Sequence, residues 1–480
     1  MSGNVANRKR LISITKGNIK NGHIYLSGHH DFFPKECYGK SNQKAGQGKL
    51  LNLFLDGIGD TVQTDISIDR NGNPRNFFRK RDWVARFFQK YRIQEGDVVA
   101  IEKIGRYSYR LYPFETQNMR TGAEVSLHWP PLDPRKPTAI DLFAGCGGFS
   151  YGLKQAGFEN LLSVEWDSAC CETFKKNISS RILNCAIQEV VNFPECDLLV
   201  GGPPCQGFSN LGEKLPNDPR RQLWRHFIRA VKEAYPLIFI MENVPPIIKS
   251  QEYQEILKES QKLGYIIEGR VLNTAFYGVP QQRKRAIIIG SRIGPPAFPK
   301  PTHIDPNEKN LYNTELPHWR TVQDAIGDMP RKPDGHNWHI GRNPTAKSQK
   351  RYRCIPPGGN RWDLPQELMP ECWKRKTKGG TDLFGRLFWD KPSVTIRTEF
   401  YKPEKGRYLH PVEHRPITHR EAARLQGFED SFEFIGKKIE VGIQIGNAVP
   451  PPFACQIGLT VKKQIDNWKR NQNDVRKSQL

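Results

Sequence analysis

Short apolar runs alternate with helix-like segments between residues 138 and 293. The following runs have the length and branched apolar residues of buried strands: TAIDLF, LLSVEW, CDLLVGG, LIFIMENV and AIIIGSR. The intervening segments YGLKQAGF and LWRHFIRAVKEA have apolar residues at helical spacing. Strands that alternate with amphipathic helices form a mostly parallel sheet covered by helices. The pattern therefore predicts an α/β fold for this region.

A proline-rich stretch divides the chain before this region. PPLDPRKP, which ends at Pro137, can neither continue a helix nor pair in a central strand. The chain of 480 residues also exceeds what a single compact core usually holds. We therefore expect an N-terminal domain over residues 1–130, a linker over residues 131–137 and a catalytic domain over residues 138–293.

The regular pattern fails over residues 294–410, where Pro, Gly, Trp, Lys and Arg are frequent. HREAARLQGF and QIGNAVPPPFACQIGLTVKKQI then restore helical spacing. We expect an irregular insert over residues 294–410 and a C-terminal part over residues 411–480 that completes the catalytic domain. Loops on a rigid scaffold commonly carry binding residues, so the insert is the expected place of substrate contacts.

Composition narrows the class of protein. Lys and Arg number 73 against 50 Asp and Glu, a formal charge of +23 that favours a polyanionic partner such as nucleic acid. Mean hydropathy is −0.64 and no long apolar run occurs, which excludes a membrane span, and the N-terminus lacks an apolar signal core. Ten scattered cysteines without a CxxC pair predict reduced thiols in a cytoplasmic protein, with no disulfide framework and no metal site.

The first chemical motif is DLFAGCGGFS, directly after a predicted strand. Its glycines, which include Gly145 and Gly147, permit a tight turn that a ligand can approach, although a purely structural turn has the same pattern. Glu165, about 20 residues further on, is placed to accept hydrogen bonds from ribose hydroxyls, and Trp166 can stack on a base. This spacing indicates an adenosine cofactor. The absence of a GxGxxG order favours S-adenosylmethionine (SAM) over a dinucleotide.

The second motif is GGPPCQGFS, in which two prolines stiffen the backbone before Cys205. A free cysteine is most often a small buried apolar residue, and a nucleophile is the alternative. Polar side chains lie at the ends of two further predicted strands, where a cleft would form: Glu242, Asn243, Gln281, Arg283 and Arg285. The expected presence of these polar residues near Cys205 favours its role as a nucleophile.

Six motifs in fixed order resemble those of the DNA (cytosine-5) methyltransferases: DLFAGCGGFS, GGPPCQGFS, MENV, QQRKR, REAARLQGF and QIGNAVPP. The resemblance covers residues 138 to about 460, roughly two thirds of the chain. It implies a Rossmann-like SAM-dependent methyltransferase fold that acts on duplex DNA. It also implies that the irregular insert is a target-recognition domain and that the last helix packs back on the first part of the catalytic domain.

The resemblance implies a role for each catalytic residue. Cys205 would add to C6 of cytosine and so make C5 an enamine carbon. Glu242 would hydrogen-bond N3 and the exocyclic amine as a carboxylic acid, and Arg285 would contact the base carbonyl. Arg283 would support the thiolate and the phosphate, and both guanidinium groups would lower the pKa of the thiol. The base that removes the C5 proton is not identified.

The same matching implies a SAM pocket and DNA contacts. The pocket residues are Phe143, Gly145, Gly147, Glu165, Trp166, Ile187, Pro204, Leu223, Asn447 and Val449. Ala186 stands where the family usually has an Asp, so an acceptor for the adenine amine is lost and looser cofactor binding is expected. Because the target base must leave the stack, Gln206, Ser209 and Thr395 are expected to contact the duplex around it.

The N-terminal domain is predicted to be β-rich. DWVARFFQKYRIQEGDVVAIEKIGRYSYRLYP combines one amphipathic helix, a Gly-Asp turn and two alternating strands. With the FFP before it, this order resembles the B3-type DNA-binding pseudobarrel. Arg79 and Arg81 would then belong to a basic face for duplex phosphates. The alternative is a scaffold that only packs on the catalytic domain.

Together these features predict a DNA (cytosine-5) methyltransferase, either the modification half of a prokaryotic restriction system with a cognate endonuclease or a solitary relative. It would act as a monomer on DNA in the cytoplasm, associated with the nucleoid. One alternative is an RNA cytosine-5 methyltransferase, because these motifs do not contact the sugar. Another is a catalytically silent DNA-binding regulator, against which the intact Cys205, Glu242 and Arg285 argue.

Overall fold

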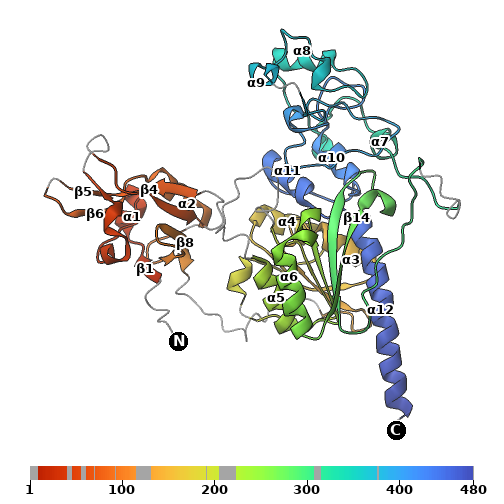
Figure 1. Cartoon of the computed structure of the whole chain (residues 1–480), viewed down its shortest axis with the longest axis horizontal. Coiled ribbons are helices and arrows are strands. Elements are labelled where there is room, and N and C mark those ends of the chain that lie inside the picture. The colour runs from red at the N-terminus through yellow and green to blue at the C-terminus, as the bar shows by residue number, and fades with distance from the viewer. Residues whose placement is uncertain are drawn as a thin grey trace. The chain divides into compact units, whose positions relative to one another are not determined.

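The computed structural model describes residues 9–40, 46–55, 61–69, 71–91, 93–114, 131–190, 192–204, 223–307, 315–375 and 378–478. The chain divides into two units, Met1–Leu127 and His128–Leu480, whose elements are labelled in Figure 1. Within the described ranges, no helix combines the length and the apolar character that a bilayer crossing requires.

The described residues of the N-terminal unit form two small sheets and two α-helices. The five-stranded sheet has, in spatial order, β1 (Lys9–Ser13), β7 (Val98–Lys103), β8 (Ser108–Phe114), β3 (Leu51–Leu55) and β4 (Thr61–Thr64). The three-stranded sheet has β2 (Tyr38–Gly39), β5 (Ile66–Ile68) and β6 (Pro74–Phe78). The helices are α1 (Lys16–Asn21) and α2 (Asp82–Tyr91).

Helix α2 forms because its apolar residues recur at helical spacing. Trp83, Val84, Phe87 and Phe88 are buried on one face and belong to the core cluster that contains the strand residue Tyr109. The helix and the two strands predicted from this part of the sequence are confirmed as α2, β7 and β8.

A seven-stranded sheet forms the centre of the large unit. Its spatial order is β11 (Ile182–Asn184), β10 (Glu159–Glu165), β9 (Thr138–Leu142), β12 (Leu198–Gly201), β13 (Ile238–Asn243), β15 (Lys284–Ser291) and β14 (Ile266–Asn273). The strands from β11 to β13 are parallel, whereas β15 runs antiparallel to both β13 and β14. The predicted α/β sheet is confirmed.

Helices cover both faces of this sheet. One core cluster contains α5 (Leu223–Ala234) and α6 (Gln251–Lys262), and another contains α3 (Gly148–Gln155) and α12 (Pro451–Ser478). In α5 the residues Trp224, Phe227, Ile228 and Val231 are buried, at the spacing of one helix face. Helix α4 (Ser168–Asn177) follows β10.

The last helix packs closely on α3, as the resemblance implied. A Cβ added to Gly152 would lie 2.5 Å from the Cβ of Ala454, and one added to Gly458 would lie 2.8 Å from the Cβ of Ala156. Only glycine at these two positions allows the backbones of α3 and α12 to come so near.

In the described part of the predicted irregular insert the helices are short, among them α7 (Val322–Ile326), α8 (Ala346–Cys354) and α9 (Glu371–Lys374). Loops leave carbonyl oxygens without the partners that helices and sheets supply. The fully buried guanidinium of Arg386 fills this gap by donating to the carbonyls of Tyr352, Ile355, His410 and Glu413 at 2.6–3.0 Å. Side-chain hydrogen bonds therefore replace regular secondary structure in this region.

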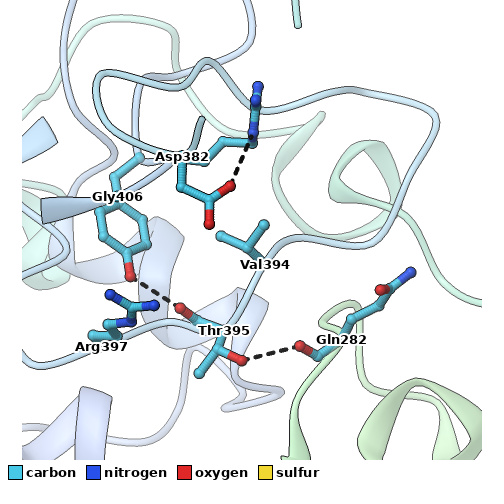
Figure 2. A pocket seen from close by; sticks show the side chains of 8 residues that line it. Gln282, Asp382, Val394, Thr395, Arg397 and Gly406 are labelled. Atoms are coloured by element: carbon cyan, nitrogen blue, oxygen red, sulfur yellow. Dashed lines mark hydrogen bonds and ion pairs between the residues drawn. The ribbon is translucent and has the colours of Figure 1, made fainter. Parts of the chain in front are cut away.

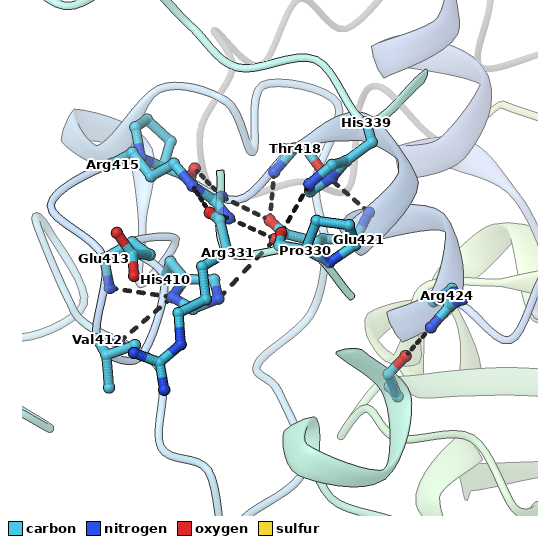
Figure 3. Close-up of polar contacts among 12 residues, drawn as sticks. Pro330, Arg331, His339, His410, Val412, Glu413, Arg415, Thr418, Glu421 and Arg424 are labelled. Atoms are coloured by element: carbon cyan, nitrogen blue, oxygen red, sulfur yellow. Dashed lines mark hydrogen bonds and ion pairs between the residues drawn. The ribbon is translucent and has the colours of Figure 1, made fainter. Parts of the chain in front are cut away.

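Helices α10 (His419–Leu425) and α11 (Lys438–Asn447) follow the insert. Figure 3 shows the polar cluster at the start of α10, where Glu421 accepts from the backbone N–H of Thr418 (2.7 Å) and pairs with Arg415 (2.7 Å). Burial alone would raise the pKa of Glu421, but the hydrogen bonds and charge of Arg415 outweigh it and hold this pKa below its ordinary value. Burial lowers the pKa of the adjacent His410 to about 4. Three polar residues of REAARLQGF, namely Arg420, Glu421 and Gln426, are thus buried within the fold.

Candidate active site

The carboxyl ends of the parallel strands bring the sequence motifs to one edge of the sheet. The Gly-rich turn follows β9, Glu165 ends β10, the GGPP segment begins in β12, and Glu242 lies near the end of β13. Neighbouring parallel strands end at the same edge, which is where ligands bind in open α/β sheets. The structure therefore gathers motifs that are up to about a hundred residues apart in sequence.

The Gly-rich turn is tied to the end of β10. The two oxygens of Glu165 accept hydrogen bonds from the backbone N–H of Gly145 (2.9 Å) and of Asp167 (2.8 Å). Gly145 and Gly147 have φ values of 56° and 91°, and Phe143 also has a positive φ of 58°. A Cβ at Gly147 would lie 2.1 Å from Cδ1 of Ile178. Glycine at residue 147 is thus required by both conformation and space, whereas a Cβ added to Gly145 would meet no atom within 4 Å.

Two buried carboxyl groups lie beneath this turn. Burial raises the pKa of Glu165 to about 7 and that of Asp141 to about 7. Ser150 Oγ donates to Asp141 Oδ2 at 2.6 Å, which opposes the shift of Asp141, and backbone donors oppose that of Glu165. A carboxylate held by backbone donors at a strand end is suited to accept hydroxyl groups.

Four more residues predicted for the cofactor are described. Trp166 is 46% exposed beside Glu165, and Ile187 is buried just after the half-buried Ala186. Val449 approaches from the C-terminal part, because a Cβ at Gly148 would lie 2.3 Å from its carbonyl oxygen. Asn447 is exposed at the end of α11. An open turn, an acidic acceptor and an exposed aromatic ring together fit an adenosine-containing cofactor.

A close ion pair joins β13 and β15 at this edge. Arg285 Nε lies 2.8 Å from Glu242 Oε1, and the two side chains are only 15% and 13% exposed. A Cβ at Gly202 would lie 3.1 Å from Glu242 Oε2, and Asn243 Nδ2 donates to the carbonyl of Pro203 at 3.1 Å. The carboxyl group of Glu242 therefore faces the segment that leads to Cys205.

Arg283 lies beside this pair and is 3% exposed. Burial lowers its pKa well below the ordinary value, the charge of Arg285 lowers it further, and Glu242 opposes both effects. Its Nη1 donates to the carbonyl of Ile396 (3.2 Å), whereas Nε has no hydrogen-bond partner in the described part of the chain. The site thus holds two guanidinium groups and one carboxyl group at the end of two adjacent strands.

Cys205, Gln206 and Ser209 lie outside the described residues, between Pro204 and Leu223. Pro204 is half-buried at the end of the GGPP segment, and Leu223 begins α5 and contacts the core beneath the sheet. Pro204 and Leu223, both predicted to bind the cofactor, are therefore described. Cys205, the predicted nucleophile, is not.

Gln281, which the sequence placed among the polar residues of the expected cleft, is the centre of a buried polar hub. Gln281 Oε1 accepts from the backbone N–H of Ile396 (2.8 Å), and Gln281 Nε2 donates to Gln426 Oε1 (2.7 Å) and to the carbonyl of Leu425 (3.3 Å). Thr395 Oγ1 donates to the carbonyl of Gln282 at 3.1 Å. QQRKR, the insert and REAARLQGF thus meet at the fully buried Gln281. Its position before a predicted strand was the sequence signal, and its partners Ile396 and Gln426 could not be predicted.

The two arginines predicted for DNA contact in the N-terminal unit differ in surroundings. Arg79 pairs with the buried Asp65 (Nε to Oδ1 2.5 Å), donates to the carbonyl of Lys40, and is 18% exposed. Arg81 is exposed, stacks over the ring of Phe77 at 4.8 Å and contacts His23. Arg79 is therefore used within the unit, and Arg81 lies at its surface.

Comparison with known proteins gives consistent matches over the large unit. Residues 138–463 match the family model for C-5 cytosine-specific DNA methylases. The type II methyltransferase M1.HphI of Haemophilus parahaemolyticus is 36% identical over 350 residues, which are 69% of this chain and 88% of that protein. M.NgoFVII of Neisseria gonorrhoeae is 32% identical over 347 residues, 70% of this chain and 89% of that protein. A crystal structure described as a DNA modification methyltransferase encoded within an E. coli prophage has a TM-score of 0.50 and 26% identity, and covers 69% of this chain and 100% of that one.

Proposed function

Because this chain belongs to the C-5 cytosine-specific DNA methylases, we propose that the residues gathered at the sheet edge carry out methyl transfer through a covalent adduct of Cys205. The protein is an enzyme that transfers a methyl group from SAM to C5 of cytosine in DNA, and its type II relatives are consistent with a restriction-modification role. The family match does not favour an RNA substrate or a catalytically silent regulator.

Cytosine C5 is too weak a nucleophile to attack a methyl sulfonium unaided. In the proposed mechanism the thiolate of Cys205 bonds to C6, and the electrons of the C5–C6 double bond become available at C5. SAM supplies the electrophilic methyl group. After transfer, loss of the C5 proton to a base lets sulfur leave and restores the aromatic ring.

Glu242 and the two arginines are proposed to stabilise charge on the ring while sulfur is attached. Glu242 would hydrogen-bond N3 and the exocyclic amine, and Arg285 would donate to the base carbonyl. Arg283, held by Ile396, would support the thiolate electrostatically. The observation that carries this proposal is the 2.8 Å contact between Arg285 and Glu242, directly opposite the GGPP segment.

The cofactor is proposed to lie over the Gly-rich turn. Glu165 would accept ribose hydroxyls, Trp166 would stack on adenine, and Phe143, Gly145, Gly147, Ile187, Pro204, Leu223, Asn447 and Val449 would line the rest of the pocket. Half-buried Ala186 offers no side-chain acceptor to the adenine amine, so cofactor affinity is expected to depend chiefly on the turn and on Glu165.

Reaching C6 requires the target cytosine to leave the stack, at a cost of a few kcal/mol. We propose that Gln206, Ser209 and Thr395 contact the duplex around the displaced base. Thr395 is half-buried, and its hydroxyl already bonds the carbonyl of Gln282 beside Arg283, which supports a position next to the catalytic groups.

The N-terminal unit is proposed to be a B3-like domain that binds duplex DNA. Its two small sheets with two helices support this, as do its excess of Lys and Arg over Asp and Glu and the exposed Arg75, Lys80 and Arg81. Deleting residues 1–130 should weaken DNA binding and make its salt dependence shallower while leaving SAM affinity nearly unchanged. Equal salt slopes would support the scaffold alternative.

We also propose that the enzyme acts as a monomer on duplex DNA in a prokaryotic cytoplasm, near the nucleoid, and that a cognate restriction endonuclease accompanies it. Bisulfite mapping of DNA from cells that express the protein would give both the product and its sequence context.

The covalent mechanism is tested by trapping. The enzyme is incubated with SAM and a duplex in which the target base is 5-fluorocytosine, whose fluorine cannot leave as a cation. The expected result is an enzyme–DNA adduct that survives denaturant and is absent in Cys205→Ser. An active wild-type preparation that gives no adduct would overturn the mechanism.

A further inference from the structure

A pocket of about 200 Å³ opens where the insert meets the QQRKR segment, as Figure 2 shows. The lining residues that bear polar side chains are Gln282, Asp382, Thr395, Arg397, Arg407 and Tyr408.

The floor of this pocket is fixed by hydrogen bonds between segments that are far apart in sequence. The backbone N–H of Gln282 donates to the carbonyl of Ser393 (2.8 Å), and its carbonyl accepts from Thr395 Oγ1 (3.1 Å). Tyr408 OH donates to the carbonyl of Thr395 at 2.9 Å. These hydrogen bonds hold Gln282, Thr395 and Tyr408 in a defined arrangement.

Asp382 keeps most of its capacity to accept hydrogen bonds. Among the described residues its ion-pair partner is Arg407, at an Nε–Oδ1 distance of 4.0 Å, and the side chain of Asp382 is 57% exposed. The guanidinium of Arg407 is occupied instead by the carbonyls of Gly358, Gly359 and Arg386 at 2.7–3.0 Å. Arg407 therefore acts as a structural residue and leaves the carboxylate of Asp382 available to a ligand.

Arg397 supplies donors on another side of the pocket. It is exposed, and within the described residues its guanidinium makes one long hydrogen bond, from Nη1 to the carbonyl of Lys405 (3.4 Å). The pocket thus combines a free acceptor with a largely free, planar set of donors.

This combination fits the edge of a base pair better than a phosphate. A carboxylate accepts from the exocyclic amine of cytosine or adenine, and a guanidinium donates to O6 and N7 of guanine. A phosphate would be repelled by Asp382 at the same place. The pocket is also close to the catalytic groups, because Gln282 and Thr395 directly precede Arg283 and its partner Ile396 in sequence.

We propose that this pocket reads one base pair of the recognition sequence near the target cytosine, with Asp382 as acceptor for an exocyclic amine and Arg397 as donor to guanine. This inference rests on the proposed function, since it requires duplex DNA as the substrate.

The test compares full-length Asp382→Asn, Arg397→Lys and a control, Asp390→Asn, with the wild type. Asp390 is an exposed carboxylate of the same segment that does not line the pocket. After bisulfite mapping defines the recognition sequence, kcat/KM is measured on duplexes in which each base pair beside the target is replaced in turn, at several salt concentrations. SAM affinity is measured for each variant to show that it is folded.

Asp382→Asn and Arg397→Lys should each lower kcat/KM on the wild-type sequence about tenfold to a hundredfold and relax discrimination at the same single base pair. Asp390→Asn should match the wild type. A loss that is equal on all duplexes, with an altered salt slope, would assign the pocket to the DNA backbone and overturn the proposal, as would unchanged discrimination in both variants. Failure of the proposed function is distinct, because the wild type would then form neither product nor adduct on any duplex.

Discussion

Arg285 Nε lies 2.8 Å from Glu242 Oε1, and this contact holds the carboxyl group against the segment that leads to Cys205. The two residues belong to neighbouring antiparallel strands, in which Asn243 pairs with Ala286. Glu242 lies opposite Ile287, and Arg285 lies two residues before Ile287 on the same face of the sheet, so the register makes Glu242 and Arg285 diagonal neighbours. The ion pair fixes the orientation of Glu242 before substrate binds.

Replacing Glu242 by Gln should lower the rate of methyl transfer about a hundredfold or more, because the neutral amide cannot take part in proton movement at N3. Single-turnover methylation of duplex DNA measures the effect, and SAM affinity should change little. The matched control is Glu268→Gln, which alters an exposed ion pair with Arg270 on β14 and should leave the rate unchanged. A Glu242→Gln enzyme with the wild-type rate would remove this residue from the mechanism.

Gly147→Ala should destabilise the protein by about 2–4 kcal/mol, because a positive φ and the collision with Ile178 act together. Gly145→Ala is the control: it has a positive φ but no atom within 4 Å of the added Cβ, so only about 1 kcal/mol is expected. Urea denaturation monitored by tryptophan fluorescence gives the free energy of unfolding of both variants and of the wild type. Equal losses of stability in the two variants would show that local movement relieves the crowding at residue 147.

SAM affinity should rise with pH around neutrality. Burial raises the pKa of Glu165 to about 7, so this carboxyl group is mostly protonated at pH 6 and mostly ionised at pH 8. The ionised form is the better acceptor for ribose hydroxyls, and binding should therefore be up to about tenfold weaker at pH 6. Calorimetric titration measures the trend. Glu165→Gln should bind more weakly with little pH dependence, and an unchanged pH trend in that variant would assign the titration to another group.

The two buried carboxyl groups of Glu165 and Asp141 predict how the free energy of unfolding of the cofactor-free protein varies with pH. The pKa values of Glu165 and Asp141 are raised from 4.5 and 3.8 to about 7, so the folded state binds these protons more tightly than the unfolded chain. Their stabilising contribution is present below about pH 4 and is lost as pH rises towards 7. The double variant Glu165→Gln, Asp141→Asn should have a free energy of unfolding that varies less with pH between about pH 4 and 7. A double variant with the same pH dependence as the wild type would contradict the assignment of this effect to the two carboxyl groups.

Gln281→Leu should cost about 1–3 kcal/mol, because the buried N–H of Ile396 and the side chain of Gln426 lose a partner. The insert would then be held less firmly on the catalytic strands, so KM for DNA should rise while SAM affinity stays close to that of the wild type. Gln349→Leu on the exposed face of α8 serves as the control and should change stability by no more than about 0.5 kcal/mol. A Gln281→Leu variant with normal stability would show that the hub is dispensable.

The strands of the large unit could be predicted because their apolar runs are local features. TAIDLF, LLSVEW and LIFIMENV correspond to β9, β10 and β13, and the helices between them follow from apolar spacing. The candidate site followed from the same pattern, because polar motifs at the ends of parallel strands must meet at one edge.

The insert could not be predicted in the same way. Its loops are held by guanidinium–carbonyl bonds such as those of Arg386, which join residues 24 to 34 positions apart and leave no periodic trace in the sequence. For the same reason Arg79 could not be distinguished from Arg81 as a surface cation. Its partner Asp65 lies 14 residues away, between β4 and β5, whereas Arg79 directly follows β6, and only folding brings the two together.

The sequence alone determined the order of the motifs, the α/β class and the residue types of the site, because these depend on neighbours along the chain. Tertiary structure decided which groups touch: Arg285 with Glu242, Gln281 with Ile396, and Arg407 with carbonyls instead of Asp382. The physical reason is that hydrogen bonds and ion pairs act over about 3–4 Å. Which side chains come within that distance is set by strand register and by the packing of the insert.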